Sequence, residues 1–201
     1  ATTSTFDQFK LKMLPEMNLV FEDLLRIGRY WSKERIIELS EGLVPVGGKN
    51  GGRFLAQNSN DRMWGRIILR SAEAKAGLEA ATIKAAVMDE IGQPEYTLDT
   101  WEAVLRRLSL SQGSVLGVST LYNLGWLKTE VFDRWWSGDP LFEVIQFDST
   151  ENPSFPVEEF ERAKAAMPAW KFDMFYRGRY AKPAGLVYDC FDEAACVINP
   201  F

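Results

Sequence analysis

Apolar residues recur at steps of three and four in the first fifth of the chain, which is the spacing of one helix face. The pattern starts near Leu14, and Pro15 suits the first turn of a helix. Gly28 interrupts it, so residues 14–39 are predicted to form two helices, the second carrying Trp31 and Leu39. The face of the first helix consists of Leu14, Met17, Phe21, Leu24, Leu25 and Ile27.

Short continuous apolar runs follow, and amphipathic stretches alternate with them. The runs at 66–70, 83–88, 114–120 and 141–147 are predicted strands, whereas 42–65 is rich in glycine and is predicted to be a loop or loose hairpin. Helices are expected at 98–109, capped by Thr97 or Asp99, and at 124–136, 158–166 and 169–177. This alternation is typical of an α/β fold with a mainly parallel sheet.

Composition narrows the chemistry that is open to the chain. Its 201 residues are 46% hydrophobic, which suits one domain with a substantial core, and no apolar run is long enough to span a membrane. The chain contains no histidine, which excludes Ser-His-Asp triads and histidine general bases. Its net charge of −5 means that any contact with nucleic acid is local or is made by another part.

Two adjacent carboxylates stand at the end of the predicted strand in KAAVMDEIGQ, residues 84–93. Ligands of open α/β sheets bind at the carboxyl ends of strands. There, Asp89 could hold Mg²⁺, usually through water, and Glu90 could activate a water for attack on phosphorus. By itself the pattern more often describes a strand that simply ends at the surface.

Hydroxyl groups end the next predicted strand, SVLGVST, at Ser119 and Thr120. The separation from Asp89 leaves room for one helix, so the two strands form a β-α-β unit whose carboxyl ends meet. The hydroxyls could therefore reach a phosphate at the acidic pair. Capping of the following helix is the alternative role for these side chains.

The order of these motifs resembles the large terminase subunit of tailed double-stranded DNA phages. TSTFDQFKLKMLPE is similar to the segment that follows the second strand of that ATPase fold, and RSAEAKAGLEAATIKAAVMDEIGQ to its run into the Walker B motif. GSVLGVSTLYNLGWL resembles the coupling motif. NPSFP, FYRGRYAKPAGLVYDCF and the residues between them resemble the lid and the approach to a nuclease domain.

The resemblance implies an α/β ATPase core of the P-loop type over 1–148, a helical lid over 149–180 and a linker over 181–201. It implies a motor that hydrolyses ATP with Mg²⁺ and packages double-stranded DNA. Expected partners are the portal protein of the procapsid, the small terminase subunit and copies of the chain in a ring, in the cytoplasm of the bacterial host. The implied site residues are Asp89 for the metal, Glu90 for catalysis, Ser119 and Thr120 for coupling, and Arg66 or Arg70 as a transition-state arginine.

The phosphate-binding loop of that family, G-x4-G-K-S/T, has no counterpart here. VPVGGKNGG comes nearest, but Asn50 replaces the Mg²⁺-binding hydroxyl and Leu43 replaces the first glycine. We therefore expect this chain alone to hydrolyse ATP very slowly. Two alternatives are a non-enzymatic docking module for DNA, portal or a partner protein, and a Mg²⁺-dependent hydrolase that uses Asp89, Glu90 and Asp189.

Overall fold

The computed structural model describes residues 1–40, 45–46, 53–54, 63–73 and 82–182. The chain divides into two compact units, Ala1–Ser119 and Thr120–Phe201, each described by itself below. The domain boundaries expected at residues 148 and 180 stay predictions. The GGKNGG stretch, Asp189 and the predicted linker beyond residue 182 lie outside the described residues.

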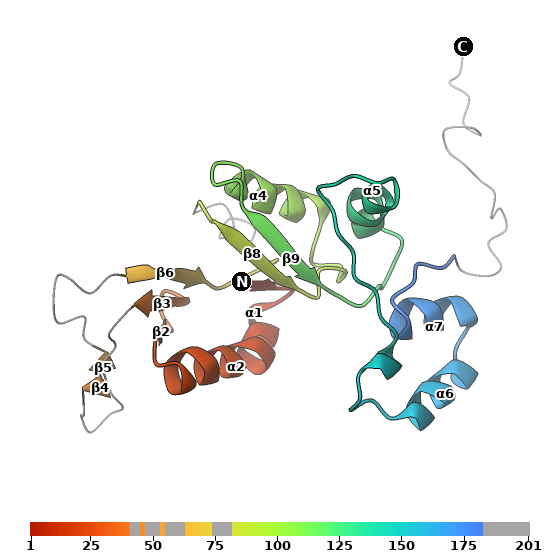
Figure 1. Cartoon of the computed structure of the whole chain (residues 1–201), viewed down its shortest axis with the longest axis horizontal. Coiled ribbons are helices and arrows are strands. Elements are labelled where there is room, and N and C mark those ends of the chain that lie inside the picture. Colours follow the sequence, from red (N-terminus) through yellow and green to blue (C-terminus); the bar gives the residue numbers. More distant parts are fainter. Residues whose placement is uncertain (41–44, 47–52, 55–62, 74–81, 183–201) are drawn as a thin grey trace, which may run out of the picture. The chain divides into compact units, whose positions relative to one another are not determined.

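A four-stranded parallel sheet forms the centre of the first unit (Figure 1). Its order is β7-β1-β8-β9, with bounds Arg70–Ser71, Thr2–Thr3, Ala85–Asp89 and Ser114–Val118. Helix α4, Leu98–Leu108, connects β8 to β9, and the Thr97 hydroxyl caps it by accepting the amide proton of Thr100. Helix α4 buries Trp101, Val104 and Leu108. The predicted parallel α/β architecture, with strands near 83–88 and 114–120 and a helix near 98–109, is confirmed.

Residues 14–24 of the first predicted helix are helical, as expected, but the helical stretch begins at Phe6, eight residues before the predicted start. The stretch consists of α1, Phe6–Gln8, a π-helical turn at Phe9–Met13, α2, Leu14–Asn18, and a second π-helical turn at Leu19–Leu24. The predicted second helix is wrong. Arg26 adopts φ +54°, which ends the helix, and the chain then forms β2, Gly28–Trp31, and β3, Ile36–Ser40.

Strands β2 and β3 form an antiparallel sheet with β6, Met63–Ile68, in the order β2-β3-β6. Its inner face packs on the N-terminal helical stretch, in a core made by Phe9, Leu14, Ile37 and Leu69 with Tyr30, Leu39 and Ile67. Ile37 and Leu39 are two residues apart, which is the period of a strand. Residues 36–40 fit both the spacing of a helix and that of a strand. Burial of Ile37 and Leu39 against the helical stretch favours the strand. A further short pair joins β4, Pro45–Val46, to β5, Arg53–Phe54.

The second unit is helical in its described part. A π-helical turn at Lys128–Phe132 continues into α5, Asp133–Trp136, within the predicted helix at 124–136. A 3-10 turn at Ser149–Glu151 precedes α6, Val157–Ala166, and α7, Ala169–Tyr176, which match the last two predicted helices. Helices α6 and α7 share a core of Phe160, Ala163 and Phe172.

The strand predicted at 141–147 does not form in the described structure. The segment has no regular secondary structure, and Leu141 and Ile145 are about four-fifths exposed. An apolar run becomes a strand only where a neighbouring strand accepts its backbone hydrogen bonds. No described strand pairs with this segment.

Candidate functional site

The acidic pair lies at the carboxyl end of β8, beside the end of β9. Residues Asp89 and Val118 face each other in the parallel ladder, so Ser119 follows directly at the same sheet edge. In Figure 1 the arrowheads of β8 and β9 mark this edge. Asp89, Glu90 and Ser119 are all half-buried. The first unit therefore brings the predicted metal ligand, the predicted catalytic carboxylate and one predicted coupling residue to the end of neighbouring strands.

Two hydrogen bonds fasten the loop after Asp89 to the end of β9. The Ile91 amide donates to the Val118 carbonyl oxygen at 3.2 Å, and the Gly92 amide donates to the Ser119 Oγ at 2.8 Å. The Gln93 amide then donates to the Glu90 carbonyl oxygen at 3.0 Å, closing a tight turn. Ser119 thus supports the loop that carries Glu90, a role that the sequence did not predict.

Glu90 has a backbone conformation that is uncommon for a residue with a side chain. Its φ is +56°, in the left-handed region that favours glycine. Such a conformation costs on the order of 1–3 kcal/mol, and surrounding contacts must maintain it. The bonds from Ile91 and Gly92 to the end of β9 supply such contacts immediately after Glu90.

A buried tyrosine lies close to the acidic pair. The Tyr96 hydroxyl is 2.7 Å from Thr2 Oγ1, across from β8, where Thr2 pairs with Met88. Burial raises the pKa of the Tyr96 phenol far above its usual range, and the charge of Asp89 adds to the rise. The phenol therefore stays protonated and cannot act as a base near neutral pH. Sequence reasoning missed Tyr96, because a single aromatic residue in a turn carries no distinguishing pattern.

The remaining predicted site residues are Thr120, which follows Ser119 in the chain, and two arginines on other strands. Thr120 is the first residue of the second unit. Arg66 is in β6 of the antiparallel sheet, where its Nη2 is 3.2 Å from Glu38 Oε1. Arg70 is in β7 of the parallel sheet and donates from Nη1 to the Leu69 carbonyl oxygen at 2.8 Å. Their proposed role as a transition-state arginine stays a prediction.

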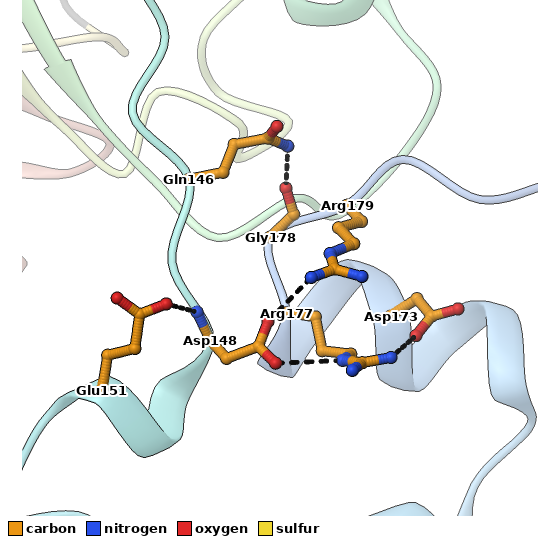
Figure 2. Close-up of polar contacts among 7 residues, drawn as sticks. All are labelled: Gln146, Asp148, Glu151, Asp173, Arg177, Gly178 and Arg179. Carbon is orange, nitrogen blue, oxygen red and sulfur yellow. Dashed lines mark hydrogen bonds and ion pairs between the residues drawn. The ribbon is translucent and has the colours of Figure 1, made fainter.

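The second unit contains a polar cluster at the end of α7, in the FYRGRY segment (Figure 2). Arg177 Nε donates to Asp148 Oδ2 at 3.1 Å, and Arg177 Nη1 is 3.5 Å from Asp173 Oδ1. Arg179 Nη2 lies 3.7 Å from Asp148 Oδ1. Both guanidinium groups therefore converge on one carboxylate, and they join the end of α7 to the segment before the 3-10 turn.

Backbone geometry completes this cluster. Gly178 adopts φ +59°, and the Gln146 amide side chain donates to its carbonyl oxygen. The Glu151 side chain accepts from the Asp148 amide at 3.0 Å, which fixes the carboxylate between the two segments. Sequence reasoning left the arginines undecided between lid packing and DNA contact, and did not identify Asp148.

A metal ion at Asp89 would need ligands besides the carboxylate. In the described parts of the chain, no group of three or more histidine, cysteine, aspartate or glutamate side chains is arranged to hold one. Mg²⁺ keeps several waters and binds through one or two carboxylates plus phosphates of the substrate, so a single half-buried Asp fits it. No helix in the described residues is long and apolar enough to cross a membrane.

Comparison with solved structures identifies the fold. The chain is similar to the large terminase ATPase domain of Thermus phage P74-26, with 17% identity, a TM-score of 0.60, and 87% of this chain and 73% of that chain covered. An arginine-to-alanine mutant of that domain gives 16% identity, a TM-score of 0.63, and coverage of 90% and 75%. A large terminase from a thermophilic bacteriophage gives 12% identity and a TM-score of 0.64, over 96% of this chain and 43% of that one.

No family model matches the chain, and no curated protein matches it in sequence. The similarity to solved structures nevertheless covers most of the chain and includes the parallel sheet and its flanking helices. The resemblance seen in the sequence motifs is thus confirmed at the level of architecture: the chain has the α/β fold of phage large terminase ATPase domains.

Proposed function

We propose that the chain is the ATPase portion of a phage large terminase, a motor in which ATP hydrolysis drives double-stranded DNA into a procapsid. The observation that carries the proposal is the placement of Asp89, Glu90 and Ser119 at one edge of the parallel sheet. Parallel α/β sheets bind ligands at this edge. The fold shared with terminase ATPase domains gives the placement its context.

In the proposed reaction, Asp89 holds Mg²⁺ through water and Glu90 orients the attacking water. Mg²⁺ would neutralise charge that develops on the phosphate oxygens. Because catalysis of phosphoryl transfer rests on positioning and electrostatics, carboxylates suffice and no histidine is needed. The turn that fixes the backbone of Glu90 serves this positioning.

Coupling of hydrolysis to movement is proposed to run through Ser119. This residue ends the first unit, accepts the Gly92 amide in the loop after Glu90, and is bonded covalently to Thr120 of the second unit. A change in the position of the second unit would therefore act directly on the loop that carries the catalytic carboxylate. Ser119 and Thr120 would also sense the terminal phosphate, and Arg66 or Arg70 of a neighbouring copy would stabilise the transition state.

The proposed partners and cellular location follow from the same motor function. The partners would be double-stranded DNA, the portal protein, the small terminase subunit and further copies of the chain in a ring. Packaging would take place in the cytoplasm of the bacterial host. ATP binding needs a loop that cradles the phosphates, which is why slow hydrolysis is expected for these 201 residues alone.

The experiment that tests the site is metal binding in the presence of nucleotide. Mn²⁺, a paramagnetic substitute for Mg²⁺, should broaden the NMR signals of the Ile91 and Gly92 amides when ATP is present and the chain is joined to a phosphate-binding loop. Asp89→Asn should abolish the broadening. Asp7→Asn is the control and should leave the broadening unchanged, because Asp7 is on the N-terminal helical stretch and not in the loop after β8; its side chain is about nine-tenths exposed. Broadening that is unchanged in Asp89→Asn would exclude the proposed metal ligand.

A second measurement separates the motor from the docking module. A coding sequence for G-x4-G-K-S/T shortly upstream of the codon for Ala1 would supply the phosphate-binding loop. Joined to that loop, the chain should hydrolyse ATP, and Glu90→Gln should abolish the activity. Unchanged hydrolysis in Glu90→Gln would refute the catalytic role of Glu90.

A further inference from the structure

The three-stranded sheet β2-β3-β6 has one face on the core and one face toward solvent. Its core face carries Tyr30, Ile37, Leu39 and Ile67, which pack with Phe9 and Leu14. Side chains alternate between the two faces along each strand. The opposite face, here named the outer sheet face, therefore carries Arg29, Trp31, Ile36, Glu38, Arg66 and Ile68.

A row of charges crosses the outer sheet face. Arg29 stands directly opposite Glu38 in the ladder, and Glu38 stands directly opposite Arg66. The Glu38 carboxylate is shared, because Arg66 Nη2 lies 3.2 Å from Oε1 and Trp31 Nε1 donates to Oε2 at 2.9 Å. Two guanidinium groups thus face one carboxylate, and the row carries a net positive charge.

An aromatic ring orders one of these arginines. The Arg29 guanidinium lies over the Trp31 ring, with its central carbon 4.2 Å from the ring centroid. Stacking uses the flat face of a guanidinium, whereas bidentate bonds to phosphate use its edge. The Arg66 side chain is 56% exposed. Arg66 is therefore accessible to an anion, and Arg29, which is half-buried, is held at the same face by its stacking on Trp31.

The β2-β3 hairpin is slightly basic, whereas the chain as a whole is acidic. Residues 28–40, which form β2, β3 and their turn, include three basic side chains and two acidic ones, in a chain with a net charge of −5. Lys33 in the turn is exposed, whereas the Arg35 guanidinium lies over the Phe6 ring, 3.9 Å from its centroid, and so belongs to the core side of the sheet. A basic patch on an acidic protein is the local footprint expected of a phosphate-binding surface.

We propose that the outer sheet face binds the phosphate backbone of double-stranded DNA. Arg29 and Arg66 are two strand spacings apart, about 10 Å. One DNA strand carries a phosphate about every 3.4 Å of helix axis, so the two arginines can contact separate phosphates. The charge favours a polyanion as the ligand, and the choice of duplex DNA rests on the proposed function.

The test is the affinity of the 201-residue chain for a short labelled duplex, measured by fluorescence anisotropy without ATP between about 50 and 200 mM salt. Arg29→Gln should weaken binding about threefold to tenfold at 50 mM salt and reduce the salt slope by about one. Glu38→Gln should tighten binding, because it removes the one carboxylate of the row. Arg106→Gln is the control, since Arg106 is an exposed arginine on α4, paired with Glu102, and the substitution removes the same charge outside the outer sheet face.

Equal affinities for Arg29→Gln, Glu38→Gln and the unchanged chain would overturn the proposal. Competition by polyglutamate as effective as competition by unlabelled duplex would also overturn it, in favour of an acidic protein partner. Circular dichroism of each variant checks folding, which should persist because these side chains point away from the core. Since no ATP is used, the outcome is independent of hydrolysis: the expected DNA binding, together with no hydrolysis by the chain joined to a phosphate-binding loop, would refute the proposed function alone.

Discussion

Removal of the Ser119 hydroxyl offers a direct test of how the acidic loop is held. In Ser119→Ala the Gly92 amide loses its 2.8 Å acceptor, while the neighbouring bond from Ile91 to Val118 remains. A hydrogen bond of this kind contributes about 1 kcal/mol net. Gly92 is half-buried, so water can replace the hydroxyl only in part.

The readout is the exchange rate of the Gly92 amide with solvent. Local opening free energy governs exchange, so a loss of about 1 kcal/mol predicts exchange about fivefold faster in Ser119→Ala. Ser119→Thr retains the hydroxyl and should retain the protection. Ser109→Ala is the control, because Ser109 donates to the Arg106 carbonyl oxygen at the end of α4, away from the loop.

The same variants test whether the hydrogen bond from the Gly92 amide to the Ser119 hydroxyl has the proposed role in catalysis. If Ser119 positions Glu90 through the loop, Ser119→Ala should lower kcat of an ATP-hydrolysing form more than it raises KM, and Ser119→Thr should restore it. Unchanged exchange at Gly92 in Ser119→Ala would refute the structural argument. Normal kcat together with faster exchange would refute only the catalytic one.

Four further predictions concern global or local stability. Gly113→Ala should lower the free energy of unfolding by about 1–3 kcal/mol in thermal melts, because its Cβ would lie 2.1 Å from the Lys84 carbonyl oxygen. Tyr96→Phe should cost about 1–2 kcal/mol in urea unfolding, since the buried Thr2 hydroxyl loses its partner. The raised pKa of Tyr96 also predicts stability that is intact below about pH 10, the pKa of an unfolded tyrosine, and falls above it. This alkaline loss should be smaller in Tyr96→Phe. Asp148→Asn should speed proteolysis after α7, because both arginine contacts share that carboxylate.

The sequence predicted those elements whose stabilising pattern is local. Strand β8, helix α4 and strand β9 each combine an apolar pattern with a cap or a turn, and all three formed near the expected residues. The hairpin at 28–40 was missed because Ile36, Ile37 and Leu39 satisfy helical spacing as well as strand alternation. Packing of Ile37 on Phe9 and Leu14, which are distant in sequence, decides between the two.

Residue types at the site were more predictable than their contacts. Parallel strands one helix apart place Asp89 near Ser119, and this placement follows from topology alone. Which group the Ser119 hydroxyl bonds depends on the path of residues 90–93, and that path depends on the left-handed conformation of Glu90. The sequence Asp-Glu-Ile-Gly does not predict such a turn, because its glycine is Gly92, two positions after the residue that adopts the left-handed conformation.

The left-handed turn at Glu90 is relevant to the proposed coupling of the two units. Because Glu90 is a non-glycine residue at φ +56°, its backbone would relax if the bonds after it opened. One of those bonds ends on Ser119, which is the last residue of the first unit. In the proposed coupling, a displacement of Thr120 would act through Ser119 on the Gly92 bond, and through that bond on the turn that holds Glu90 at its left-handed φ. The proposal therefore needs only the covalent link from Ser119 to Thr120 and one hydrogen bond to connect movement of Thr120 with the position of the proposed catalytic carboxylate.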